Sequence, residues 1–125
     1  MIAYLRNEAG ANTFLTVVED AASTVYAHAA NLAEVFYDTR RAGGETAAPD
    51  AMRVLAAAGV AFRDDMDRLF WEDAARIKTD FRRVSLADCF GLALTRRTAG
   101  VFLSTGHHEL EAIQAAGVCT IQFIR

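Results

Sequence analysis

Two acidic residues stand in matching sequence settings, each three positions after a polar residue. The two stretches read Asn31-Leu-Ala-Glu34 and Ser85-Leu-Ala-Asp88. Magnesium prefers oxygen ligands, and a bound ion could orient a phosphodiester, neutralise its charge and lower the pKa of an attacking water. The same spacing is that of the helix capping box, in which the acid satisfies free amides at a helix start. Glu34 and Asp88 are therefore candidates for metal binding, for capping, or for both at once.

Three other groups of polar residues allow a chemical and a structural interpretation. The acidic run over residues 64–67 has ligands for a metal, but it also suits a solvated helix start. His107 and His108 are adjacent, so on a helix they point in different directions and make a poor ligand pair. Arg96 and Arg97 have the charge to contact a phosphate, and they equally suit the negative end of a helix dipole.

Composition predicts one globular domain over residues 1–125. The chain is 53% apolar and 23% charged, and no apolar run approaches the ~20 residues of a membrane helix. We expect no membrane association, no signal peptide and a cytoplasmic protein. A net charge of −3 disfavours unselective coating of nucleic acid and leaves room for a local contact. Cys89 and Cys119 lie in apolar segments without metal-ligand spacing, which indicates reduced core thiols.

The elements that must position Glu34 and Asp88 are short apolar strands alternating with helices. Strands are expected at residues 24–27, 60–62, 101–104 and 120–124, and helices at 2–22 with a break near Gly10, 31–41, 49–58, 64–81, 85–97 and 108–116. Such alternation predicts a mostly parallel sheet with helices on both faces. Ligands bind such sheets beyond the carboxyl ends of the strands, which is where both acids are expected.

Four segments, taken in order, resemble the PIN-domain family, and specifically the VapC-like toxins of bacterial toxin–antitoxin systems. They are IAYLRNEAGA at residues 2–11, NLAEV at 31–35, SLADCFGLAL at 85–94 and FLSTGHHELEAIQAAGVCTIQFIR at 102–125. The resemblance implies a three-layer α/β/α fold with about five parallel strands. It also implies an endoribonuclease dependent on Mg²⁺ or Mn²⁺ that cleaves RNA, forms a homodimer and is silenced by an antitoxin protein.

Carried over by position, Glu34 and Asp88 match two of the family's four site acids. Asn31 and Thr105 match the polar residues beside them, whereas Gly106 stands where the family has its last acid. The family's first acid ends a strand that lies before residues 2–11, so we expect a domain truncated at its N-terminus relative to the family. Fewer carboxylates hold a dication less tightly. The expected function is therefore weak or absent RNA cleavage, and the alternative is a catalytically inactive PIN module that binds an antitoxin or RNA.

Overall fold

The computed structural model describes all residues from Met1 to Arg125 and shows an α/β protein of seven helices and four short strands. Its contacts divide the chain into two compact units. Unit 1 comprises Met1–Arg63 with Ile124–Arg125, and unit 2 comprises Asp64–Phe123. Each unit contains one pair of parallel strands.

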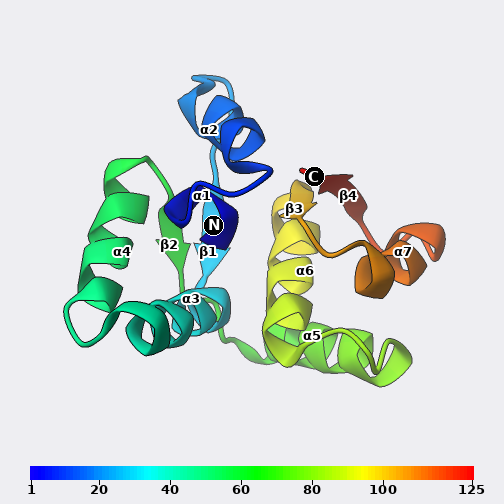
Figure 1. Cartoon of the computed structure of the whole chain (residues 1–125). Helices are drawn as coiled ribbons and strands as arrows, with labels where there is room; N and C mark the ends of the chain where they lie inside the picture. The colour runs from blue at the N-terminus through cyan, green and yellow to red at the C-terminus, as the bar shows by residue number, and fades with distance from the viewer. The chain divides into compact units, whose positions relative to one another are not determined.

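Unit 1 is built on two helices that pack against each other beside a parallel strand pair (Figure 1). Its elements are α1 (Ile2–Leu5), α2 (Ala11–Glu19), β1 (Tyr26–His28), α3 (Ala29–Gly43), α4 (Ala47–Ala57) and β2 (Ala61–Arg63). The packing helices are α3 and α4, which bury Leu32, Val35 and Leu55. Burying apolar side chains on one stripe of each helix is what holds such a pair together.

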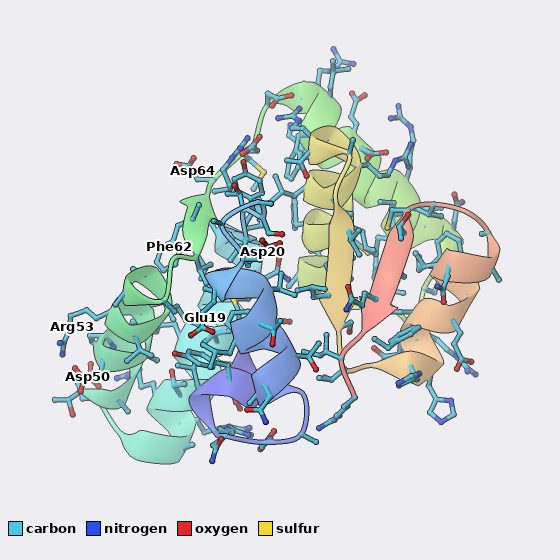
Figure 2. All side chains as sticks on the ribbon, turned by 90° about the horizontal axis from the view of Figure 1, so that it is seen from above. Glu19, Asp20, Asp50, Arg53, Phe62 and Asp64 are labelled. Atoms are coloured by element: carbon cyan, nitrogen blue, oxygen red, sulfur yellow. The ribbon has the colours of Figure 1, made fainter.

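The outer surface of α4 is charged. Asp50 and Arg53 are three residues apart and form an ion pair, and Figure 2 shows both side chains projecting from this helix.

At the opposite end of the chain, Ile124 lies against the turn before α2. Gly10 has φ +96° there, and a Cβ at this position would lie 2.8 Å from the Ile124 carbonyl oxygen. Only glycine suits both the backbone conformation and the space.

Unit 2 has two packed helices followed by a strand, a helix and a strand. The elements are α5 (Arg68–Asp80), α6 (Leu86–Thr98), β3 (Val101–Ser104), α7 (His107–Ala115) and β4 (Thr120–Phe123). Its core contains Phe70, Leu92, Leu110, Ile113 and Ile121, all at most 5% exposed. Strands β3 and β4 pair in parallel from Val101 opposite Thr120 to Ser104 opposite Phe123.

The sequence correctly predicted an α/β protein with parallel strands, and it placed β3 at its observed residues. The strands form two separate two-stranded sheets, where the sequence predicted one mostly parallel sheet. The expected break near Gly10 is present, between α1 and α2. None of the helices combines the length and the apolar character that crossing a membrane requires.

Candidate functional site

Asp88 lies in the first turn of α6, where its amide is held by Ser85. Ser85 is the N-cap residue in an extended conformation, with φ −62° and ψ 153°. Its hydroxyl accepts a hydrogen bond from the Asp88 amide at 3.0 Å. The capping interpretation of Ser85 is therefore confirmed, and the cap fixes the backbone that carries the Asp88 carboxylate.

The Asp88 carboxyl group is half-buried, and its pKa is raised above the ordinary value. Burial is the main cause, because a charged carboxylate is less stable away from water. A hydrogen bond with the Ser85 side chain lowers the pKa, and the negative charge of Glu109 raises it. Glu109 is thus an electrostatic neighbour of Asp88 that sequence reasoning missed. The signal for it was an acid in the first turn of α7, directly after the β3 turn.

The chain path brings the β3 turn back along α6. Helix α6 ends at Thr98, only Ala99 and Gly100 separate it from β3, and the two elements are in contact. The charge of Glu109, in the first turn of α7, acts on Asp88, so the segment after β3 lies near the start of α6. The carboxyl end of β3 therefore leads into Thr105 and Gly106, and then into the helix that bears Glu109.

Gly106 is the N-cap residue of α7, and nothing in its conformation requires glycine. Its φ is −91°, which any residue adopts. A Cβ added to Gly106 would have space, because its closest neighbour would be the Ser104 hydroxyl at 3.6 Å. The same hydroxyl accepts a hydrogen bond from the Gly106 amide at 3.0 Å. The turn is therefore fixed by Ser104, and an aspartate fits at position 106.

Glu34 and Asn31 lie on α3, and the structure corrects the capping interpretation made for them. The N-cap of α3 is His28, whose Nδ1 accepts a hydrogen bond from the Ala30 amide at 3.1 Å. The helix begins at Ala29, so Asn31 is its third residue and Glu34 its sixth. A buried histidine ring ends the strand and supplies the acceptor, and the two alanines that follow favour the helix. Glu34 is exposed and has no capping role.

The predicted site residues therefore fall into two groups. Asp88, Thr105 and Gly106 lie in unit 2, together with Glu109, while Glu34 and Asn31 lie in unit 1. No group of three or more histidine, cysteine or acidic residues that could hold a metal ion is present. Asp88 and Glu109 offer two carboxylates, and Mg²⁺ is commonly bound by one or two carboxylates with several waters. Their chemistry fits Mg²⁺ or Mn²⁺ and does not fit a metal that needs sulfur or nitrogen ligands.

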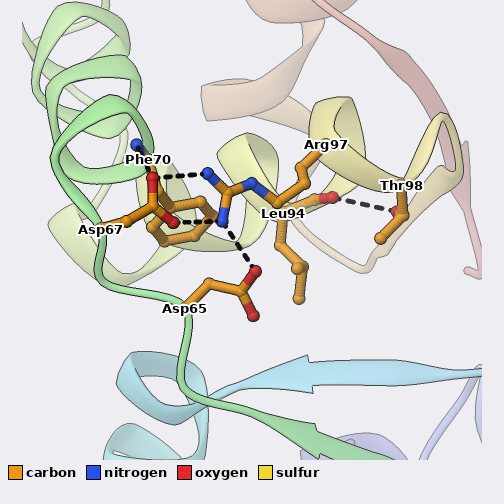
Figure 3. A network of polar contacts seen from close by, with 6 residues as sticks. All are labelled: Asp65, Asp67, Phe70, Leu94, Arg97 and Thr98. Carbon is orange, nitrogen blue, oxygen red and sulfur yellow. Dashed lines mark hydrogen bonds and ion pairs between the residues drawn. The ribbon is translucent and has the colours of Figure 1, made fainter.

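The acidic run before α5 binds Arg97 at the end of α6 (Figure 3). The Arg97 guanidinium donates to the Asp67 carboxylate at 2.5 and 2.8 Å and to Asp65 at 2.9 Å, and it lies 4.8 Å from the centre of the Phe70 ring. Asp67 also caps α5 by accepting from the Phe70 amide. Arg96 pairs with Asp73 at 3.1 Å. The run is therefore a helix start bound to an arginine, which explains both groups without a metal or a phosphate.

The remaining candidates are two histidines and two cysteines, and the contacts and burial of these side chains are those of structural residues. His107 and His108 are exposed at the start of α7, as expected, and the His107 ring stacks on Phe123 with centroids 4.1 Å apart. Cys89 is buried and Cys119 half-buried, and both are free thiols whose pKa is raised by burial.

No protein-family model matches this chain, and no curated protein sequence matches it. The resemblance to PIN-domain proteins rests on the four sequence segments and their order.

Proposed function

We propose that this chain is a PIN-like protein related to the VapC-like toxins, with a three-layer α/β/α fold and a vestigial, Mg²⁺- or Mn²⁺-dependent ribonuclease site. The support for the proposal is the order of four matching segments over nearly the whole chain. The parallel strand pairs and the interleaved helices are compatible with such a fold.

The observation that carries the proposal is the environment of Asp88. Its carboxyl group is half-buried at a rigid helix start, and its charged form is disfavoured by burial and by Glu109. A cation beside the two carboxylates would remove this cost, because an opposite charge favours the ionised form. Acids destabilised in this way are typical of functional sites, and a purely structural cap gains nothing from the second acid.

In this proposal Asp88 and Glu34 are metal ligands, Glu109 adds charge beside Asp88, and Asn31 and Thr105 are supporting polar residues. A bound Mg²⁺ or Mn²⁺ would neutralise the phosphodiester and lower the pKa of a coordinated water. Ser85 keeps the Asp88 backbone in place through its cap. The other partners proposed with this function are a cognate antitoxin and a second copy of the chain, in the cytoplasm.

Gly106 favours a second form of the proposal, in which the chain is a catalytically inactive PIN module that binds an antitoxin or RNA. Position 106, in the turn after β3, has room for a Cβ, yet the residue there is glycine. Metal affinity rises with the number of charged ligands, so the lack of an acid there weakens the site. We therefore expect weak or absent cleavage from the chain as it stands.

The decisive experiment separates metal binding from cleavage. The purified chain is titrated with MgCl₂ and MnCl₂ while its melting temperature is followed, and the same samples are incubated with single-stranded RNA. A metal-induced rise in Tm that is lost in Asp88→Asn and reduced in Glu34→Gln supports the site. Asp50→Asn is the matched control, since Asp50 is an acid in the first turn of α4.

The cleavage assay then decides between the two forms. Cleavage in Gly106→Asp that is absent from the unchanged chain supports a vestigial site that one carboxylate restores. Binding of metal without cleavage in either protein supports the inactive module. A Tm that does not respond to either metal contradicts the metal site, and with it the vestigial nuclease.

A further inference from the structure

The exposed side of α3 carries a groove lined by aromatic rings and arginines. Its volume is about 470 Å³, and it lies wholly within unit 1. The lining residues are Phe36, Tyr37, Arg40, Arg41, Gly44 and Glu45. Phe36 is 40% exposed and Tyr37 61% exposed. Exposed apolar side chains that share one groove mark a candidate interaction site.

The groove begins one helical turn from Glu34. Tyr37 and Arg41 follow Glu34 by three and seven residues in the same helix, so the three side chains share a face. With a rise of about 1.5 Å per residue, Tyr37 lies roughly 4.5 Å and Arg41 roughly 10.5 Å farther along the axis. An RNA strand that fills the groove therefore has to extend by only about one helical turn to reach Glu34.

The two arginines of the groove can exchange their carboxylate partners for a phosphate. The Arg41 guanidinium lies 5.4 Å from the centre of the Tyr37 ring and pairs with Asp38 at 2.8 Å. Arg40 pairs with Glu45 at 2.6 Å. Both arginine side chains are more than half exposed, and exposed ion pairs contribute little, so each guanidinium can turn to a phosphate at small cost.

We propose that this groove binds single-stranded RNA, with a base stacked on Tyr37 and the adjoining phosphates held by Arg40 and Arg41. The inference rests on RNA being the substrate of the proposed function, and it assigns residues that position that substrate beside Glu34. Aromatic rings accept any base by stacking, and arginine supplies the planar donor that phosphate prefers. The two guanidinium groups favour RNA over an apolar protein segment, because a phosphate accepts the hydrogen bonds that they donate.

The test is direct binding of a fluorescent ten-nucleotide oligouridylate, followed by anisotropy in EDTA so that no metal-dependent cleavage takes place. We expect Tyr37→Ala to weaken binding by about 5-fold or more, because stacking on one aromatic side chain contributes that much. Tyr37→Phe should bind like the unchanged chain. Arg41→Gln should weaken binding and reduce the slope of log Kd against log salt by about 0.7, the value for one phosphate on a single strand.

Two matched controls locate the effect. Arg53→Gln removes another exposed arginine that pairs with an acid three residues away, and Tyr26→Ala removes a second tyrosine that lies under an arginine, Arg63, also at 5.4 Å. Both variants should bind with unchanged Kd. Equal binding by Tyr37→Ala and the unchanged chain overturns the inference, and so does equal weakening by the groove variants and the controls.

Failure of the groove and failure of the proposed function have different signatures. RNA cleavage that Tyr37→Ala leaves unaltered, or no RNA binding at all, rejects the groove while the metal titration still tests the function. Binding that depends on Tyr37 in a protein that shows neither a metal response nor cleavage supports the groove and rejects the nuclease.

Discussion

The Ser85 hydroxyl and the Asp88 amide are joined by a 3.0 Å hydrogen bond that begins α6 and fixes the acid in a half-buried position. The bond satisfies the backbone of Asp88, and the carboxylate itself remains partly desolvated beside Glu109. A capping residue and an acid whose charged form is disfavoured therefore occur within one helical turn.

Replacing Asp88 by asparagine should raise the melting temperature at pH 7 without added metal. The pKa of Asp88 is raised above 3.8 in the folded chain, so the folded state holds its proton more tightly than the unfolded state. The stability that this group contributes is fully present below pH 3.8 and is lost as the pH rises through the folded pKa. The gain from Asp88→Asn should therefore vanish below pH 3.8. A Tm difference that is the same at pH 3.5 and pH 7 would contradict the desolvation of Asp88.

Gly106→Asp should fold normally and be slightly more stable. The Cβ would make an ordinary contact at 3.6 Å, and an aspartate at the N-cap of α7 gains a few tenths of a kcal/mol over glycine. Urea unfolding measures this difference. Gly106→Ala is the control, because alanine fills the same space and cannot cap. A loss of more than ~1 kcal/mol in Gly106→Asp would show that the turn does not accept a side chain.

Arg97→Met should lower the Tm more than Arg96→Met does. Arg97 binds two carboxylates and covers the Phe70 ring, whereas Arg96 has a single ion pair with Asp73. Two parallel bonds to one carboxylate are stronger than a lone surface pair. Arg97→Lys should recover only part of the loss, since an ammonium cannot reproduce the fork. Thermal melts at low and high salt measure the effect, and equal losses in the two methionine variants would refute it.

Leu92→Ala should cost about 2–5 kcal/mol of unfolding free energy, because Leu92 is 0% exposed in the core of unit 2. Leu86→Ala is the matched control in the same helix. Leu86 is 54% exposed, so its truncation should change stability by no more than about 0.5 kcal/mol. Denaturant unfolding followed by circular dichroism measures both. Similar losses in the two variants would place the core elsewhere on α6.

Several features were determined by the sequence because they depend on neighbours in the chain. Ser85 and Asp88 are three residues apart, and the residue types of a capping box suffice to predict the bond between them. The three apolar residues that begin β3, followed by polar residues, predicted that strand correctly. The alternation of strands and helices predicted parallel pairing, because parallel strands need a helical crossover.

Other features were decided only by the tertiary structure, because they join residues distant in sequence or depend on burial. Arg97 meets Asp67 and Asp65 across 30 and 32 residues, so the acidic run appeared to be a possible metal site until its partner was known. His28 begins α3 because its buried ring presents Nδ1 to the helix, which residue preferences do not predict. The sequence shows Glu109 as an acid at the start of a helix, but only the fold of β3 and α7 brings its charge near Asp88.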